Sequence, residues 1–152
     1  MLRMIEIEKS FNIGTINEKE IFKGLNLTIN DGDFITVIGG NGAGKSTMLN
    51  LIAGVHKADG GRIILDGEDL TYKNETQRAK YIGRVFQDPM MGTAPTMMIE
   101  ENLAMAYRRT KRRTLAWGIS QKEREMYKES LAQLGLGLED RMKTKVGLLS
   151  GG

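Results

Sequence analysis

Nine consecutive residues carry a pattern that suits phosphate chemistry. They are Gly39, Gly40, Asn41, Gly42, Ala43, Gly44, Lys45, Ser46 and Thr47, and they fit G-x-x-x-x-G-K-[ST] at every fixed position. A triphosphate needs several hydrogen-bond donors that converge on it, and glycines let backbone N–H groups approach closely because they have no Cβ. The stretch therefore predicts a site for a nucleoside triphosphate.

Three side chains of this stretch have expected roles. Lys45 should meet the β- and γ-phosphate oxygens as a mobile point charge, and the Ser46 hydroxyl should ligate the Mg²⁺ that bridges them. Thr47 is expected to contact the α-phosphate. The competing interpretation is a glycine-rich strand-to-helix turn with an exposed lysine.

The flanking sequence supports the phosphate interpretation. Residues 34–38 form a short unbroken apolar run, which predicts a strand buried on both faces. A helix should begin at Lys45 and end at Gly54, where a left-handed residue can terminate it. Its apolar residues lie on nearly every side and are Met48, Leu49, Leu51, Ile52 and Ala53.

The composition of the 152 residues fits one domain, or part of one, with a real core, since 40% of them are hydrophobic. There are no cysteines, so disulfides and thiolate metal sites are excluded. No apolar run approaches the length of a membrane span, and acidic Glu6 lies where a signal peptide would have its apolar core. A net charge of +3 is too small to indicate nucleic-acid binding.

The N-terminal part reads mainly as strands. Alternation predicts half-buried strands at 2–9, closed by Phe11, and at 21–29, and turn residues at 30–33 predict that the second strand forms a hairpin with 34–38. Further strands are expected at 62–65 and 82–86, the latter leading to Gln87, with a short helix at 74–80.

The pattern becomes helical from Thr96 to Lys145. One stripe contains Ile99, Leu103, Ala106 and Tyr107. Ser120-Gln121-Lys122-Glu123 is a capping box, followed by Tyr127, Leu131 and Leu134 at helical spacing and by Gly135 as a stop. This region predicts a separate helical layer.

Three further stretches resemble the ATP-binding cassette (ABC) family. Leu149-Ser150-Gly151-Gly152 resembles the start of its LSGGQ signature, Val85-Phe86-Gln87-Asp88 resembles its glutamine loop, and Phe11 matches the aromatic residue that stacks on adenine. The order and spacing of these features agree with the family over residues 2–152. The resemblance implies an α/β fold, a P-loop NTPase of ABC type, with an antiparallel β subdomain, a partial RecA-like core and a helical subdomain.

The resemblance also implies ligands and partners. In ABC proteins two domains sandwich two ATP molecules head to tail, so Ser150, Gly151 and Gly152 of one copy would contact the γ-phosphate held by Lys45 of the other. Gln87 would face both the Mg²⁺ with its attacking water and a transmembrane permease subunit. The expected location is the cytoplasmic face of the bacterial inner membrane, with no nucleic-acid partner.

The chain departs from the family pattern in one large respect. The signature glutamine, the Mg²⁺-site aspartate, the catalytic glutamate and the switch histidine of ABC domains all follow the point where this sequence stops. The resemblance therefore implies a piece of a domain, with residues 1–95 as the β subdomain and phosphate-loop core and residues 96–152 as the helical subdomain. His56 is expected to be an exposed loop residue without a role.

Several interpretations stay open. The basic run Arg108–Arg113 reads as a solvated face or as a contact with lipid headgroups or an acidic permease surface. Phe11 could be a core aromatic instead of a base-stacking one. The methionines Met90, Met91, Met97 and Met98 indicate adaptable packing rather than a metal site. The alternatives to a transporter subunit for small-solute uptake are a soluble ABC ATPase acting on DNA or ribosomes and a nucleotide-binding piece without catalysis.

Overall fold

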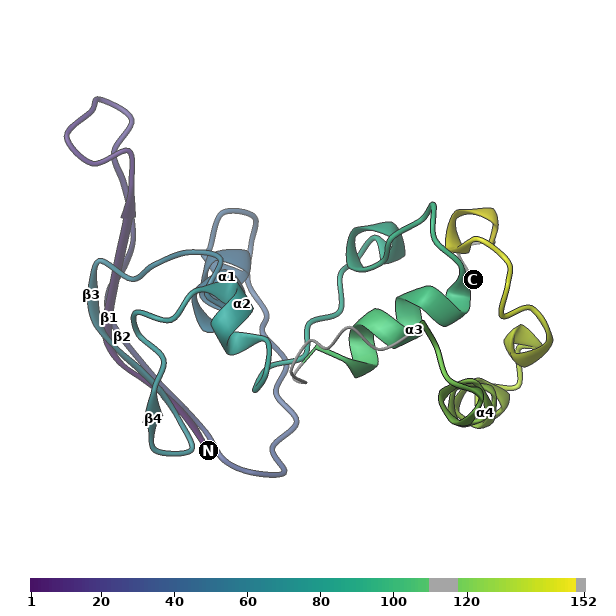
Figure 1. Ribbon diagram of the computed structural model, residues 1–152. Helices are drawn as coiled ribbons and strands as arrows, with labels where there is room; N and C mark the ends of the chain where they lie inside the picture. Colours follow the sequence, from purple (N-terminus) through teal and green to yellow (C-terminus); the bar gives the residue numbers. More distant parts are fainter. Residues whose placement is uncertain (110–117, 150–152) are drawn as a thin grey trace. The chain divides into compact units, whose positions relative to one another are not determined.

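The computed structural model describes residues 1–109 and 118–149. Contacts within the chain divide it into two units, Met1–Ile82 and Gly83–Gly152 (Figure 1). Residues 83–95, which the sequence placed with the first part, group with the second unit. Each unit is described by itself.

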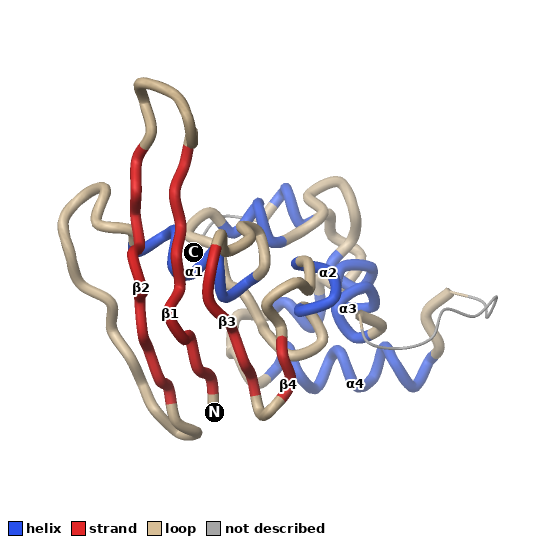
Figure 2. The backbone as a smooth tube through the Cα atoms, turned by 90° about the vertical axis from the view of Figure 1, so that its left-hand side faces the viewer, coloured by secondary structure: helices blue, strands red, loops and turns tan. Residues whose placement is uncertain are grey.

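The first unit is a small antiparallel sheet with two helices. Its elements are β1 (Leu2–Phe11), β2 (Lys19–Ile29), α1 (Lys45–Ala53), β3 (Gly60–Leu65), β4 (Glu68–Asp69) and α2 (Glu75–Arg78). The strands follow the order β2-β1-β3-β4, with every pair antiparallel (Figure 2). The α/β class predicted from the sequence is confirmed.

The longest pairing joins β1 to β2. Leu2 lies opposite Ile29 at one end and Phe11 opposite Lys19 at the other. The predicted hairpin between 21–29 and 34–38 is therefore wrong, because β2 pairs with the strand before it rather than with the segment after it. Both β1 and β2 were predicted as strands. The alternation in β2 shows which side chains share a face, but it does not show which strand pairs with β2.

One core joins the sheet to α1. Its buried residues come from β1, α1, β3 and the segment after β4, and they are Leu2, Met4, Ile7, Leu51, Ile63 and Leu70. Within α1, Leu51 is fully buried whereas Leu49 is 55% exposed. The helix is therefore buried along one side, not on nearly every side.

A glycine allows β3 to approach β1 at an irregularity in the register. Gly61 has φ +84°, and a Cβ at this position would lie 2.3 Å from the carbonyl oxygen of Glu6. Glu6 itself has φ +47°, and the register shifts between Ile5 and Glu8. Only glycine fits this β-bulge without displacing backbone.

Two strands expected from apolar runs do not form. Residues 34–38 and 82–86 are irregular, and Phe34 and Ile38 are 96% and 89% exposed. An apolar run becomes a buried strand only where neighbouring strands accept its hydrogen bonds and helices cover its faces. Within the described residues no strand pairs with 34–38, so this apolar run stays irregular.

The second unit is helical. Its elements are η1 (Pro89–Gly92), α3 (Ile99–Tyr107), α4 (Gln121–Ala132), η2 (Leu138–Asp140) and η3 (Val146–Leu148). Its core holds Ile99, Ala104, Tyr127, Leu131 and Met142. Three positions of the expected apolar stripes, Ala106, Tyr107 and Leu134, are exposed instead, and Leu134 lies beyond the last turn of α4.

The predicted capping box begins α4. The Ser120 side chain accepts a hydrogen bond from the Glu123 N–H, and Glu123 accepts one in return from the Ser120 N–H. That hydrogen bond, together with the Arg108 guanidinium at 2.9 Å, lowers the pKa of Glu123 to about 2. The Glu123 carboxylate of the capping box therefore stays ionised at every physiological pH.

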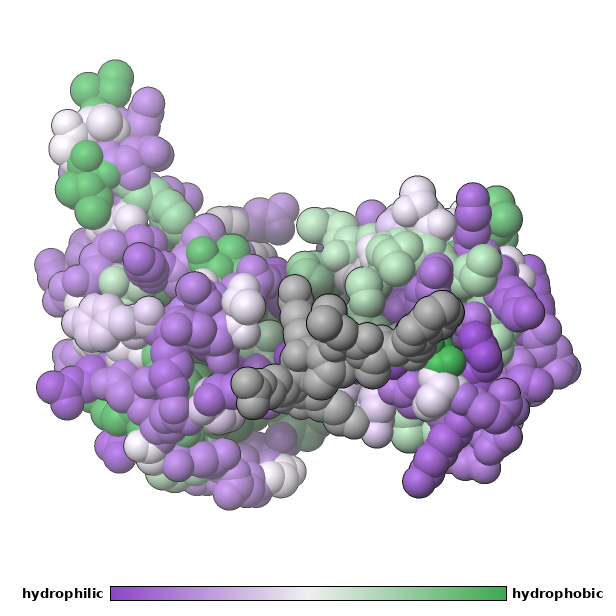
Figure 3. Space-filling model, in the orientation of Figure 1, coloured by the Kyte–Doolittle hydropathy of each residue, from purple (hydrophilic) through white to green (hydrophobic). Residues whose placement is uncertain are grey.

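Figure 3 shows hydrophobic residues at the tip of the β1–β2 hairpin, among other parts of the surface. At this tip Ile13 and Ile16 are 64% and 102% exposed.

No helix within residues 1–109 and 118–149 has the length and apolar character needed to cross a membrane.

Candidate nucleotide-binding site

The phosphate loop leads directly into α1, as predicted. The helix begins at Lys45 and follows Gly44, which has φ +87°, while Gly42 has φ +81°. A Cβ on Gly44 would lie 2.9 Å from side-chain atoms of both Ile21 and Phe22 on β2. Glycine at this position is therefore required twice, by its backbone conformation and by the close approach of β2.

The start of α1 offers donors to an anion. Gly44 has no side chain that could cap the first turn, and no side-chain cap is present. The first N–H groups of a helix have no partner within it, and the helix dipole favours negative charge there. Ser46 is exposed and Thr47 half-buried in this same turn. The geometry suits a phosphate group.

Lys45 folds across the loop. Its Nζ donates hydrogen bonds to the carbonyl oxygens of Gly39, at 2.5 Å, and Gly40, at 2.7 Å. Both acceptors belong to the loop that was predicted to surround the phosphates. A phosphate would therefore compete with two neutral carbonyls for the ammonium, and charge-assisted hydrogen bonds to an anion are the stronger kind.

The β1–β2 pairing brings Phe11 to the same region. Phe11 lies directly opposite Lys19 in the register, and a Cβ built on Gly42 would lie 3.4 Å from the Lys19 Nζ. The strand end that carries Phe11 is thus next to the loop, although the two are about thirty residues apart in sequence. Lys19 was missed in the sequence analysis, because a lysine at the start of a strand has no distinguishing pattern.

The ring of Phe11 is held by two neighbours, His56 and Lys9. The His56 ring meets it edge to face with centroids 5.3 Å apart, and Lys9 Nζ lies 5.2 Å from its centroid. Asp59 fixes Lys9 through a hydrogen bond of 2.7 Å. His56 is half-buried, so the expectation of an exposed loop position is wrong. It packs here because the turn after α1 carries it to the end of β1.

The arrangement predicts a selective effect of Phe11→Ala. Base–aromatic stacking contributes about 1–3 kcal/mol, so ATP should bind about tenfold more weakly. Pyrophosphate has no base and should bind with unchanged affinity. Titration of both ligands into the variant, with Ile13→Ala as a control at the exposed hairpin tip, checks this. Equal losses for both ligands would identify Phe11 as a packing residue only.

The remaining predicted residues lie in the second unit. Gln87 is exposed, and the segment before it is irregular rather than a strand. Phe86 beside it packs against Gly92, and the Arg84 guanidinium lies 4.5 Å from the Phe86 centroid. Ser150, Gly151 and Gly152 lie outside the described residues.

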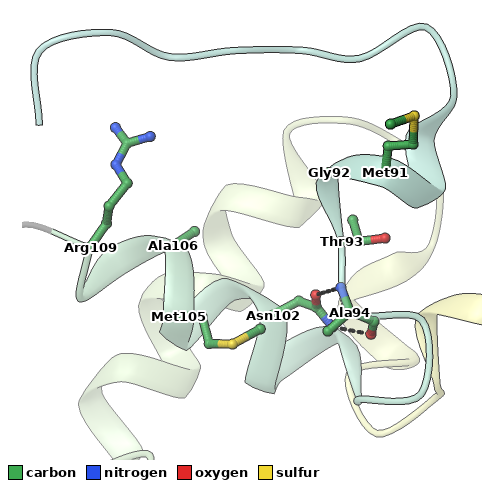
Figure 4. A pocket seen from close by; sticks show the side chains of 8 residues that line it. All are labelled: Met91, Gly92, Thr93, Ala94, Asn102, Met105, Ala106 and Arg109. Carbon is green, nitrogen blue, oxygen red and sulfur yellow. Dashed lines mark hydrogen bonds between the residues drawn. The ribbon is translucent and has the colours of Figure 1, made fainter. Parts of the chain in front are cut away.

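The second unit also contains a pocket between the loop after η1 and α3. Its volume is about 440 Å³. The lining residues are Met91, Gly92, Thr93, Ala94, Asn102, Met105, Ala106 and Arg109 (Figure 4). The Asn102 side chain accepts a hydrogen bond from the Ala94 N–H at 2.8 Å and donates to the Ala94 carbonyl at 3.1 Å. These two hydrogen bonds fix the loop to α3 and shape the floor of the pocket.

Relatives with curated names are ATP-binding proteins of transporters. A tyrosine transport ATP-binding protein of Clostridioides difficile is 38% identical over 152 residues, which is all of this chain and 60% of that protein. A spermidine/putrescine import ATP-binding protein PotA of Pasteurella multocida is 40% identical over 111 residues, 73% of this chain and 28% of that protein. The chain thus spans less than two thirds of these relatives.

Solved structures give the same result. The ATP-binding cassette MJ0796, in a dimeric post-hydrolysis state bound to ADP and Pi, matches with a TM-score of 0.79 and 26% identity. The match covers 99% of this chain and 64% of that one. A nucleotide-free cassette from an ABC transporter matches with a TM-score of 0.71 and 30% identity, over 99% and 59% of the two chains. The ABC transporter family description covers residues 22–152, and the chain belongs to that family of P-loop ATPase cassettes.

Proposed function

We propose that this chain is the ATP-binding part of the ATPase subunit of a bacterial ABC transporter that takes up a small solute. One observation carries the proposal: the phosphate loop at the start of α1 lies beside the strand end that presents Phe11. Loop and ring together suit the phosphate and base ends of one nucleotide. The names of the relatives, which include tyrosine and polyamine transport, support a small solute as cargo.

Mg²⁺ would enter the site with the phosphates. Within the described residues no three His, Cys, Asp or Glu side chains gather as a metal site, so no carboxylate cage is formed in advance. Mg²⁺ is commonly held by one or two protein oxygens together with substrate phosphates. Ser46 offers such an oxygen at the start of α1, and Gln87 is the proposed second ligand and water contact.

The proposed assembly is a head-to-tail pair of copies on a transmembrane permease. The dimeric state of a similar cassette supports the pair. In it, Ser150, Gly151 and Gly152 of each copy would complete the γ-phosphate site of the other. The alternative of a DNA- or ribosome-acting ATPase gains no support from the described residues, whose longest helix, α4, has 12 residues and forms no coiled-coil arm.

The pocket on the second unit is the proposed contact for the permease. Met91 and Met105 are 69% and 48% exposed at its edge, and flexible thioethers adapt well to an inserted apolar side chain. Arg109 adds one cation to the lining. The cytoplasmic, peripheral location follows from this contact and is part of the proposal.

Membrane binding tests this contact. Native membranes stripped of peripheral proteins should bind the wild-type chain, whereas Met105→Glu, which puts a charge into the pocket, should reduce the bound fraction at least about tenfold. Gln133→Glu is the control, since it adds the same charge at an exposed position directly after α4. Equal sedimentation of the two variants would contradict the pocket as the contact, and binding to protein-free liposomes would replace the permease by lipid.

A further inference from the structure

A fully buried arginine connects α2 to α1, the helix whose N-terminus forms part of the candidate phosphate site. Arg78 is the last residue of α2, and its side chain is only 1% exposed. Among the described residues it has the largest volume of the side chains that are fully buried. Arginine is rarely buried to this extent unless its donors are satisfied.

The guanidinium binds the end of α1. Nη1 donates to the carbonyl oxygens of Leu51, at 2.6 Å, and Ile52, at 2.9 Å. These carbonyls belong to the last turn of α1, where helix carbonyls lack partners within the helix. That turn contains no basic residue of its own. Arg78 therefore supplies the cation that the negative end of the helix dipole favours.

The same side chain also binds the segment after β4. Nε donates to the Lys73 carbonyl at 2.8 Å and Nη2 to the Thr71 carbonyl at 3.2 Å. Thr71 is itself fixed to β3, because its hydroxyl accepts the Ile63 N–H. One guanidinium thus joins the end of α1 to a segment anchored in the sheet.

The chain makes room for this contact. Gly54 ends α1 with φ +83°, and a Cβ there would lie 2.9 Å from both Cδ and Nε of Arg78. The four acceptors are all neutral carbonyls, and burial lowers the pKa of Arg78 against the opposing field of Asp69. Burying a charge without an ion-pair partner is costly, and even buried ion pairs can often be replaced by apolar residues of similar volume without loss of stability. The arginine therefore points to a need for fixed geometry.

We propose that Arg78 is a positioning residue for phosphate binding, which fixes α1 from its far end so that the donors at Lys45 and Ser46 keep their place. The proposal rests on the proposed nucleotide function of the loop. A rigid helix loses less conformational freedom when its N-terminus binds an anion, so the affinity for the phosphate part of the ligand depends on how firmly the helix is held.

Three variants of the 152-residue chain test the role. Arg78→Met keeps the volume without the donors, Arg78→Lys keeps the charge without the planar fork, and Arg3→Met removes an exposed arginine on β1 as the control. ATP and pyrophosphate affinities are measured by NMR titration, and the folded fraction by circular dichroism. Because α1 is then held less firmly, we expect about tenfold weaker binding of both ligands by Arg78→Met, with Arg78→Lys intermediate and Arg3→Met unchanged.

The equal loss for ATP and pyrophosphate separates this role from that of Phe11. A purely structural role would lower the folded fraction and the number of binding sites while the affinity of each folded molecule stayed the same, and that result overturns the proposal. Where Arg78→Met does not fold, Arg78→Lys decides: weaker pyrophosphate binding of at least about threefold supports the proposal, and unchanged affinity overturns it. A wild-type chain that binds neither ligand fails the proposed function itself, which is visible before any variant is compared.

Discussion

Lys45→Ala is expected to abolish measurable ATP binding. In the structure the ammonium lies across the loop, bonded to the Gly39 and Gly40 carbonyls, within reach of any phosphate that enters. Hydrogen bonds that involve a charged group contribute about 1.5–3 kcal/mol each. Loss of two such bonds from Lys45 to the phosphates weakens ATP binding at least about 100-fold, and an NMR titration would no longer detect it.

Lys57→Ala is the matched control for this change. It removes the same charge at an exposed position four residues after α1, outside the loop. The control should bind ATP as the wild type does, and both variants should show wild-type circular dichroism. A Lys45→Ala chain that retains ATP affinity would support the alternative of a structural turn with an incidental lysine. Comparison with Lys19→Ala would then show whether the second ammonium, beside Gly42, holds the phosphates instead.

The sequence predicted α1 and the loop well because the determinants there are local. The helix starts at Lys45 and ends at Gly54 as predicted, and the glycines at positions 42 and 44 adopt positive φ angles that glycine allows without steric cost. The capping box at Ser120 is equally local, since it depends on residues three apart. In each case the residues that determine the geometry are neighbours in the chain.

The sequence failed where the determinants are distant. Residues 34–38 have the composition of a buried strand, but a strand needs partners, and within the described residues none pairs with it. The same holds for 82–86. Apolar composition states that a segment is suited to burial, whereas hydrogen-bonding partners decide whether a strand forms.

The region around Phe11 shows a second kind of limit. The sequence placed Phe11 at the end of a strand, and the structure confirms this position. Its neighbours Lys19 and His56 could not be predicted, since the first depends on the β1–β2 register and the second on the turn after α1. Register is set by side-chain packing over the whole hairpin, so a single residue carries no signal of it. Likewise, nothing in the sequence around Arg78 indicates a buried side chain, because its four acceptors are backbone carbonyls that any sequence offers.

We expect that these 152 residues alone do not hydrolyse ATP. Hydrolysis requires a water held in line with the γ-phosphate and a group that accepts its proton, in addition to charge stabilisation by Lys45 and Mg²⁺. The ABC resemblance places the Mg²⁺-site aspartate and the catalytic glutamate after the signature, so neither is expected among residues 1–152. Gln87 can orient a water, but a neutral amide is a very poor proton acceptor, so binding and positioning remain without the proton transfer.

Phosphate release with ATP and Mg²⁺ measures this directly. The wild-type chain and Lys45→Ala should give the same rate, equal to that of buffer, because general acid–base catalysis alone typically contributes 100- to 10,000-fold, as an order of magnitude. Weak ATP binding by the wild type in the NMR titration shows that the loop is formed in the same sample. A wild-type rate that exceeds the Lys45→Ala rate would mean that a carboxylate within residues 1–152 activates the water. Individual replacement of the acidic side chains, beginning with Glu18 and Glu20, which flank Lys19 in the sequence, would then identify it.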